Sequence, residues 1–354
     1  MKSQNDQGYV VANPMDRRGF LKLAGLAVIG GAVAAAAWPS KKPGSQSVSF
    51  SSGLHLADET RLIMGTYATI TVLDPSKDKA QEALGKAFDL MHQKSIMLSR
   101  HRPDGAVAVL NANGGLDGSP PELIDLIQAS FKINFLTSGN FDITVAPAVD
   151  LLKNSFAANN KPPTMAEVEE VRGLIGMDSI KVEGDKIRLN KSGSRITLDG
   201  IAKGHIVDET LKYLAQRGVK HALVNAGGDM AMFGGREDGK PWRVGIADPK
   251  AQHSSKTVIT MTQGAITTSG NYAIFFDKEK LYHHIIDPRT ALSPHGDSSV
   301  SALARTAREA DGLSTAAFVM GPKKGLDFLE RYPDVEGLII TREGNIFKTK
   351  KWPA

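Results

Sequence analysis

The sequence predicts a mixed α/β (α+β) fold that forms a single two-lobed catalytic unit. Two patterns are interleaved along the chain: apolar residues at helical spacing, and alternation of apolar and polar residues. Hydrophobic residues make up 41% and charged residues 23% of the chain, which excludes the disordered and fibrous classes. No internal repeat and no break in composition divides the body of the chain.

The first half of the body is predicted to begin with a strand and two helices. Alternation from Tyr67 onward predicts a strand at residues 61–73. Amphipathic patterns predict a long helix at residues 77–98 and a second helix at residues 120–136. The remaining elements of this half are a shorter helix and a hairpin, at residues 164–174 and 180–189.

The second half is organised around residues 196–229. A short apolar run leads into a small-residue turn at residues 199–204, and the helix that follows closes at Gly218. A strand from His221 then ends in a glycine-rich turn at residues 225–229. Both turns leave backbone groups free to meet a ligand, although a plain strand–helix–strand unit explains them equally when they are taken alone. The other predicted elements are strands at residues 242–247 and 257–261, helices at 310–320 and 322–332, and a hairpin at 337–348.

Residues 1–37 are predicted to be a twin-arginine signal peptide. Arg17 and Arg18 lie in the sequence DRRGFLK, an apolar run of small residues follows, and three alanines ending at Ala37 fit an A-x-A cleavage site. The alternative is a membrane anchor, but the run of about 15 apolar residues is shorter than the ~20 needed to span a bilayer. The leader therefore predicts a periplasmic protein with no stable membrane span after cleavage, and whether the leader is cleaved stays open.

After the leader, we expect a linker at residues 38–60 and the catalytic domain at residues 61–354. The net charge of +5 is too small to predict a nucleic-acid partner, although a local basic site for a phosphorylated small molecule stays open. The chain has no cysteine, which excludes disulfides, thiolate metal sites and a cysteine nucleophile.

The densest polar group is YHHIIDPRT at residues 282–290, where a predicted strand runs into a proline turn. A neutral imidazole at His284 can act as a base or orient a phosphate, and Arg289 can pair with a phosphate. The alternative is a hairpin turn capped by Asp287 with exposed histidines. Spacing alone favours neither interpretation.

A second group lies in the predicted helix at residues 310–320. Asp311 and Thr315 stand four residues apart on one helix face, so both can supply oxygen to a hard cation such as Mg²⁺. For this motif alone, helix capping by Asp311 is the favoured alternative. Residues 139–144 and the segment at Met64 are turns when taken alone. No G-x-S-x-G, H-E-x-x-H or Walker A motif is present, which argues against serine hydrolysis, a zinc site and a P-loop.

Seven segments in this order resemble the FAD:protein FMN transferases, the ApbE family. They are MGT from Met64, GNFDITVAP from Gly139, GIAKGHIVDE from Gly200, LVNAGGD from Leu223, ITTSGNY from Ile266, YHHIIDPRT from Tyr282 and ADGLSTA from Ala310. The resemblance covers nearly the whole body and implies the family's T-fold-like architecture. It also implies transfer of the FMN half of FAD to a threonine or serine hydroxyl of a target protein, with Mg²⁺ and release of AMP.

The resemblance assigns roles to particular residues. Attack on a pyrophosphate needs a cation against developing charge and a group that takes the hydroxyl proton. Proton transfer is assigned to His284, with Asp287 close by. The expected Mg²⁺ ligands are Gly200, through its backbone, Asp311 and Thr315. The expected FAD-binding residues are Met64, Asn140, Phe141, Asp142, Thr144, Lys203 and Ser269.

The chain departs from the family at several positions. Thr197 stands in place of an aspartate, Leu152 in place of a tryptophan and Ala291 in place of a glycine, and residues 100–106 replace an aromatic, serine-containing stretch. These departures motivate one alternative, a periplasmic FAD carrier with little catalysis. A further alternative is a Mg²⁺-dependent FAD pyrophosphatase, in which water replaces the acceptor hydroxyl.

The resemblance also implies an acceptor flavoprotein with a D-x-x-[ST]-G-A-[ST] motif. This motif is absent from the chain itself, so self-flavinylation is not expected. A twin-arginine leader without a lipid-modified cysteine resembles the NosX-like subgroup, the accessory factors of nitrous-oxide respiration. That subgroup implies a membrane-bound electron-transfer partner.

Overall fold

The computed structural model describes residues 46–49, 53–236, 239–249, 251–271, 274–295 and 297–353. The predicted leader lies outside these residues. A nine-stranded sheet, antiparallel at every pairing, forms the centre of the protein. In spatial order its strands are β1 (Gln46–Ser49), β2 (His55–Ile63), β3 (Thr66–Asp74), β7 (His221–Ala226), β8 (Asp229–Phe233), β11 (Gly264–Gly270), β12 (Asp297–Ala304), β13 (Glu336–Thr341) and β14 (Ile346–Lys348).

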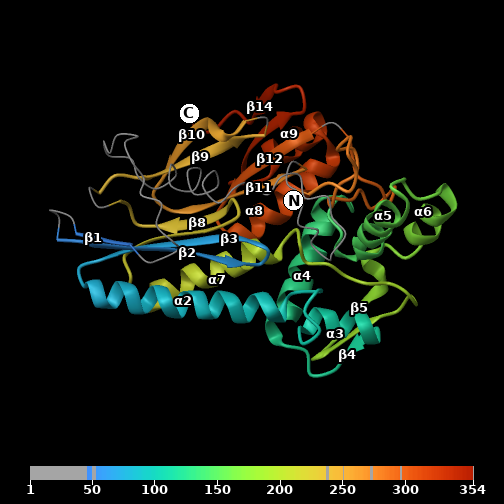
Figure 1. Cartoon of the computed structure of the whole chain (residues 1–354), viewed down its shortest axis with the longest axis horizontal. Helices are drawn as coiled ribbons and strands as arrows, with labels where there is room; N and C mark the ends of the chain where they lie inside the picture. Colours follow the sequence, from blue (N-terminus) through green and yellow to red (C-terminus); the bar gives the residue numbers. More distant parts are fainter. Residues whose placement is uncertain are drawn as a thin grey trace, which may run out of the picture.

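Helices cover one face of this sheet and a two-stranded hairpin covers the other (Figure 1). In β3, Ile70 and Val72 pack into the cluster under the helices, whereas Leu73 packs into the cluster that includes Trp242 of the hairpin. This is the two-residue period of a strand that is buried on both faces. The helices are α2 (Lys77–Met97), α7 (Ala202–Gln216), α8 (Ala307–Met320) and α9 (Pro322–Arg331), and the hairpin is β9 (Trp242–Asp248) and β10 (Ala251–Met261).

A second lobe is inserted between α2 and α7 and lies to one side of the sheet (Figure 1). Its small sheet has the order β4–β6–β5 and extends the expected hairpin by one short strand. The elements of this lobe are α3 (Ala106–Asn113), β4 (Gly115–Leu116), α4 (Pro121–Leu136), η1 (Ile143–Val145), α5 (Ala146–Asn159), α6 (Met165–Arg172), η2 (Met177–Ser179), β5 (Ile180–Glu183) and β6 (Lys186–Leu189). The predicted mixed α/β fold is confirmed.

Two predictions at the start of the domain are wrong. Residues 55–60, assigned to the linker, lie in β2, and the single strand predicted at residues 61–73 is a hairpin of β2 and β3. Met64 and Gly65 form its turn with φ values of 57° and 71°, the left-handed conformation that two-residue hairpins prefer. Polar and charged residues fill most of β2, so it lacks the alternation that marks a half-buried strand.

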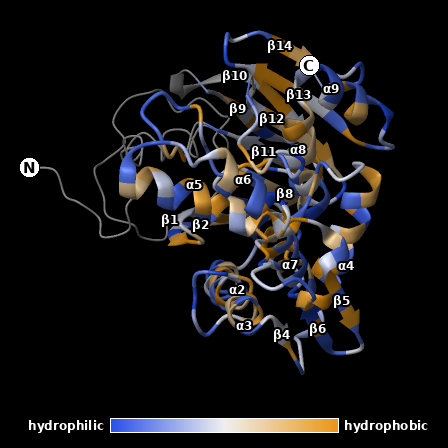
Figure 2. Ribbon diagram, turned by 90° about the vertical axis from the view of Figure 1, so that its right-hand side faces the viewer, coloured by the Kyte–Doolittle hydropathy of each residue, from blue (hydrophilic) through white to orange (hydrophobic). Residues whose placement is uncertain are grey.

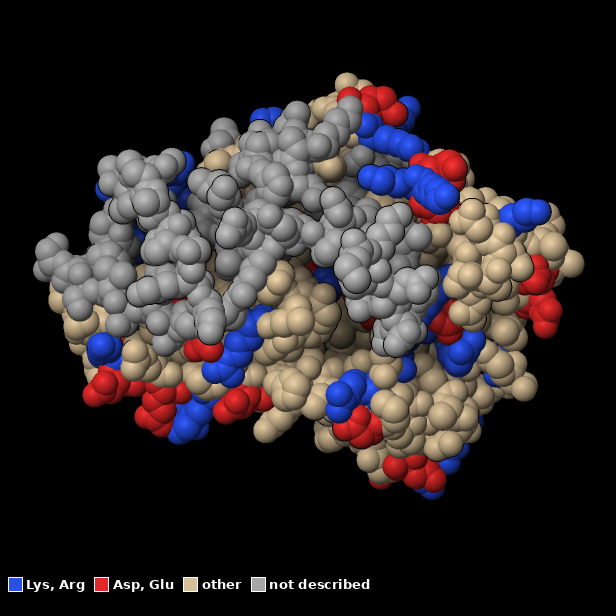
Figure 3. Space-filling model, in the orientation of Figure 1, with Lys and Arg blue, Asp and Glu red and all other residues tan. Residues whose placement is uncertain are grey.

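The surface adds two observations. Hydrophobic residues concentrate in interior strands such as β12 and β13 (Figure 2), whereas acidic and basic side chains are interspersed on the face shown in Figure 3. Across the described part of the chain, every helix is too short or too polar to cross a membrane.

Candidate active site

The helices α7 and α8 approach each other at backbone distance. A Cβ atom at Gly204 would collide with the carbonyl of Ala307, so only glycine permits this contact. The Gly204 amide donates a hydrogen bond to Oδ2 of Asp311 at 3.0 Å, and the Asp311 side chain is buried. The helix capping alternative for Asp311 is wrong, because Thr306 caps α8 and Asp311 lies in its second turn.

One turn further along α8, Thr315 lies against the turn that precedes α7. Its hydroxyl is 3.0 Å from the Ser269 hydroxyl. A Cβ atom added at Gly200 would lie 3.1 Å from Oγ1 of Thr315 and 3.3 Å from the Phe141 ring. Gly200 therefore lines a small cradle between a hydroxyl and an aromatic ring. Five residues that the sequence assigned to the site, including Asp311, meet here.

Lys203 connects this group to the glycine-rich turn after β7. Its ammonium is paired with the buried carboxylate of Asp229. Burial lowers the pKa of Lys203, but the charges of Asp229 and then Asp311 outweigh burial and raise it above the ordinary value. Burial, followed by repulsion from Asp229, raises the pKa of Asp311 to about 7. A further positive charge near Asp311 would therefore favour the ionised form of this carboxyl group.

His284 is half-buried beside the same charges. Burial lowers its pKa, the nearby carboxylate of Asp199 partly offsets this, and Lys203 adds to the lowering. The imidazole is therefore neutral at pH 7 and able to accept a proton. Within the described part of the chain, its buried Nδ1 has no hydrogen-bond partner. The predicted strand around His284 is wrong: residues 282–290 form an irregular loop with isolated bridges, because the buried Asp287 turns the backbone.

The adjacent histidine has a different role. His283 is buried, its Nε2 lies 3.1 Å from the carbonyl oxygen of Pro294, and its ring meets Phe318 edge-on. Burial, and then repulsion from His284, lowers the pKa of His283 to about 3. This histidine is a neutral part of the core, whereas its neighbour faces the charged cluster.

Three assigned residues are not brought into the cluster. The carboxylate of Asp287 accepts hydrogen bonds from the backbone and the guanidinium of Arg289, and no described interaction joins Asp287 to His284. The carboxylate of Asp142 caps η1 by accepting from the amide and the hydroxyl of Thr144, at 2.7 and 2.5 Å. Asp142 thus starts the short helical turn η1.

The two remaining assigned residues flank the cluster. Met64 lies in the β2–β3 turn, and this turn abuts the glycine-rich turn because the Gly227 amide donates to the carbonyl oxygen of Tyr67. On the opposite side, Asn140 donates to the Thr137 carbonyl at 2.7 Å, and its buried Oδ1 has no protein partner among the described residues. This oxygen is free to accept a hydrogen bond from a ligand.

The ion pair of Asp229 with Lys203 and the position of Asp199 near His284 are not predicted by the sequence. Asp229 is the last residue of the LVNAGGD segment, which is one of the seven that resemble the family. The spacing of residues in the sequence does not indicate that Asp229 pairs with Lys203. The departures Leu152 and Ala291 both lie in the apolar cluster beside α5, away from α8. Ala291 has a φ of 56°, a backbone conformation that favours glycine.

The donor set fits Mg²⁺ better than a transition metal. Within the described residues, no group of three or more His, Cys, Asp and Glu side chains can hold a metal ion. A carboxylate, a hydroxyl and the backbone of a glycine turn are instead the hard oxygen donors that Mg²⁺ prefers. A Cβ at Gly200 would be crowded by Thr315 and Phe141, so the glycine keeps its backbone close to the Thr315 hydroxyl.

Comparisons with known proteins identify the family to which the chain belongs. A sequence model of the ApbE family matches residues 64–339. The FAD:protein FMN transferase of Treponema pallidum is 31% identical to this chain over 304 residues, which cover 79% of this chain and 83% of that protein. The protein of the same name from Vibrio cholerae is 29% identical over 304 residues, which cover 83% and 89%.

Two solved structures of ApbE proteins are similar to this chain. The crystal structure of the ApbE protein from Thermotoga maritima matches with a TM-score of 0.75 at 28% identity, and the match covers 83% of this chain and 97% of that chain. The flavin transferase ApbE from Vibrio cholerae matches with a TM-score of 0.73 at 26% identity, covering 87% and 98%. The fold and the site thus define an enzyme of the flavin transferase class. The chain belongs to the ApbE family.

Proposed function

We propose that this flavin transferase moves the FMN half of FAD to a threonine or serine hydroxyl of an acceptor protein and releases AMP, with Mg²⁺ bound. The observation that carries the proposal is the meeting of Gly200, Lys203, Asp311 and Thr315 where α7 and α8 cross, with a neutral His284 beside them. The names of the curated relatives support the same reaction.

In the proposed reaction, one bond to phosphorus forms, one bond to phosphorus breaks, and one proton is transferred. The acceptor hydroxyl oxygen forms a bond to the phosphorus on the FMN side of the pyrophosphate, and the bond from that phosphorus to the oxygen of AMP breaks. His284 takes the proton of the attacking hydroxyl. The ammonium of Lys203 lies where it can offset negative charge on the pyrophosphate oxygens.

Asp311 and Thr315, with the backbone of Gly200, would hold Mg²⁺. When bound, this ion supplies positive charge against the developing charge of the phosphoryl group. Asn140 offers an unsatisfied oxygen to the ligand, the Phe141 ring lies next to Gly200, and Met64 lies in the β2–β3 turn that abuts the glycine-rich turn. We propose that these three residues, together with Ser269, contact FAD.

The test is transfer to a defined acceptor. Protein without residues 1–37 is incubated with FAD, Mg²⁺ and a domain that carries the D-x-x-[ST]-G-A-[ST] motif, and the acceptor is analysed by mass spectrometry. We expect a covalent FMN adduct that EDTA abolishes. Release of AMP without an adduct would replace the proposal with a pyrophosphatase, and FAD binding without AMP would replace it with a carrier.

We also propose that the protein acts in the periplasm on an exported flavoprotein, and that this partner belongs to nitrous-oxide respiration. The leader sequence with Arg17 and Arg18 supports export of a folded protein. Replacement of both arginines by lysine should retain the protein in the cytoplasm, which cell fractionation measures. Unchanged export of that variant would contradict the twin-arginine route, and normal flavinylation of the respiratory partner in a deletion strain would contradict the partner.

A further inference from the structure

Three residues of α8, spaced four apart, contact α7 and the turn that precedes it. Gly200 meets Thr315, and Gly204 donates to Asp311. Four residues further along α7, and four residues back along α8, Asp208 meets Ala307. Because residues four apart share one face of a helix, Gly204 and Asp208 lie on one face of α7, and Ala307, Asp311 and Thr315 lie on one face of α8. The contacts of Thr315 and Asp311 belong to the proposed metal site, and the contact of Ala307 is the third along the same face of α8.

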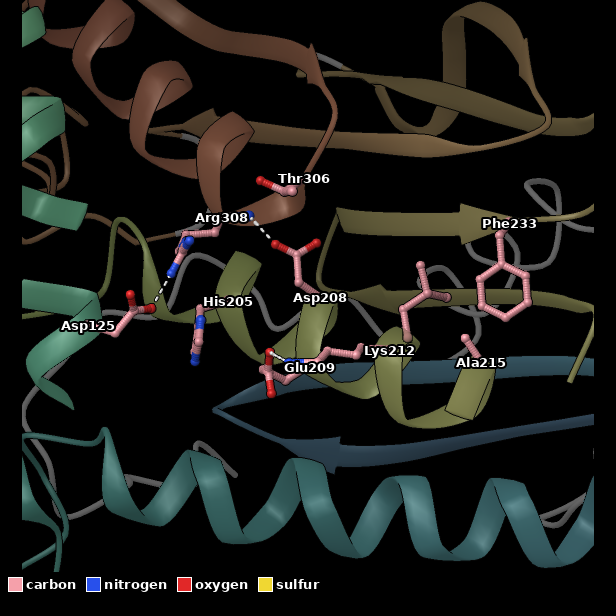
Figure 4. A pocket seen from close by; sticks show the side chains of 10 residues that line it. Asp125, His205, Asp208, Glu209, Lys212, Ala215, Phe233, Thr306 and Arg308 are labelled. Carbon is pink, nitrogen blue, oxygen red and sulfur yellow. Dashed lines mark hydrogen bonds and ion pairs between the residues drawn. The ribbon is translucent and has the colours of Figure 1, made fainter. Parts of the chain in front are cut away.

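In the third contact, the carboxylate of Asp208 in α7 caps the N-terminus of α8. Oδ1 of Asp208 accepts from the Ala307 amide at 2.7 Å, and Oδ2 accepts from the Arg308 amide at 2.8 Å. The N-terminal amides of a helix have no partner within the helix, and a carboxylate placed there also interacts favourably with the helix dipole. Figure 4 shows Asp208 extending from α7 toward the first residues of α8.

Asp208 is separate from the groups that we place at the reacting atoms. It lines a hollow of about 490 Å³ together with His205 and Arg308 (Figure 4), and Lys203 is not among the residues that line this hollow. Its carboxylate is engaged by the two amides, so its effect on the reaction has to pass through α8.

We propose that Asp208 is a positioning residue: its bidentate cap fixes α8 against α7 in the register that presents Asp311 and Thr315 to the turn at Gly200. A slip of one helical turn would move Asp311 by about 5.4 Å, which would separate it from Gly204. The inference rests on the proposed function for its kinetic readout, but its structural readout is independent of that function.

The test uses a graded series at Asp208 and a matched control. Asp208→Asn keeps one acceptor oxygen and Asp208→Leu keeps none. Asp125→Asn removes the exposed 2.5 Å ion pair with Arg308 at the same helix end but leaves the cap intact. For each variant we would measure FMN transfer as a function of Mg²⁺ concentration, and amide hydrogen exchange of peptides that contain Gly204 and Ala307.

We expect the Mg²⁺ concentration for half-maximal transfer to rise roughly tenfold to hundredfold in Asp208→Leu and less in Asp208→Asn, as for residues that orient metal ligands. The Gly204 and Ala307 amides should exchange faster in the same order. Asp125→Asn should stay within about twofold of the wild type, since exposed ion pairs contribute little.

Two results would overturn the inference. One is a folded Asp208→Leu variant with a lower melting temperature but wild-type Mg²⁺ dependence and wild-type exchange at Gly204, which would reduce Asp208 to a helix cap. The other is an equal effect of Asp125→Asn. If the wild-type protein transfers no FMN, the proposed function fails instead, and exchange at Gly204 in Asp208→Asn and Asp208→Leu still decides the positioning role.

Discussion

The α7–α8 crossing and the tight turns at Asp142 and Asp287 use polar residues differently. At the crossing, one oxygen of the buried Asp311 carboxylate accepts a hydrogen bond from the Gly204 amide, and the other oxygen remains available. The Thr315 hydroxyl lies next to Gly200. In the turns, Asp142 is bonded to Thr144 and Asp287 is bonded to Arg289. The helix interface thus leaves polar groups available to a ligand, whereas each tight turn uses its polar groups to form hydrogen bonds within the turn.

The largest expected effect separates His284 from Asp287. His284→Gln should lower kcat roughly 10²- to 10⁴-fold, the usual contribution of a general base, while FAD affinity changes little. Asp287→Asn removes only the pairing with Arg289, which should cost about 1 kcal/mol of folding stability and leave kcat in the wild-type range. Steady-state FMN transfer and thermal unfolding measure the two effects. A large loss of kcat in Asp287→Asn would show that Asp287 acts in the reaction, which would contradict its purely structural role in the turn.

The next effect concerns the ion pair between Lys203 and Asp229. Lys203→Met leaves the buried Asp229 carboxylate without its cation, which should lower the free energy of unfolding by about 1–3 kcal/mol and reduce transfer. The double variant Lys203→Met/Asp229→Asn should recover most of the stability but not the transfer, because the ammonium is still missing. Urea unfolding measures the stability. Additive losses in the double variant would contradict the pairing.

A smaller effect is the pH dependence contributed by His283. Its pKa is about 3 in the folded protein against an ordinary value of 6.5, so between these values the unfolded chain binds more protons. Stability is therefore complete above pH 6.5 and is lost as pH falls, by about 2 kcal/mol between pH 7 and pH 5 for this one group. His283→Gln, which keeps a donor for Pro294, should remove most of this difference in urea unfolding at the two pH values. An unchanged difference would assign the pH dependence to other groups.

Long periodic elements were predictable from the sequence, because their apolar residues face one buried surface. The helix α2 and the hairpin of β13 and β14 are examples, and the four-residue spacing of Asp311 and Thr315 gave a correct helix face. Strand β2 was missed because it buries few side chains. Helix α5 was missed because the β-branched residues of η1 and a proline stand at its start, and neither indicates a helix.

The site was predictable where one motif carries two ligand groups at helical spacing, and not where the partner comes from another segment. The pairing of Lys203 with Asp229 and the cap from Asp208 to Ala307 join residues that lie 26 and 99 positions apart. No local pattern encodes such contacts, since they depend on how the helices cross. For the same reason, spacing could not decide that Asp142 and Asp287 serve their own turns.

The most direct test of the metal site is binding of Mn²⁺, a paramagnetic substitute for Mg²⁺, to the FAD-loaded protein. The loss of the free Mn²⁺ resonance signal would be compared between the wild type, Asp311→Asn and Asp142→Asn. A neutral amide should be tolerated at Asp311, because burial and Asp229 already raise the pKa of this carboxyl group. We predict that Asp311→Asn weakens Mn²⁺ binding by well over tenfold, and that Asp142→Asn binds Mn²⁺ as the wild type does. Equal binding by all three proteins, or an equal loss in both variants, would contradict a metal site at the α7–α8 crossing.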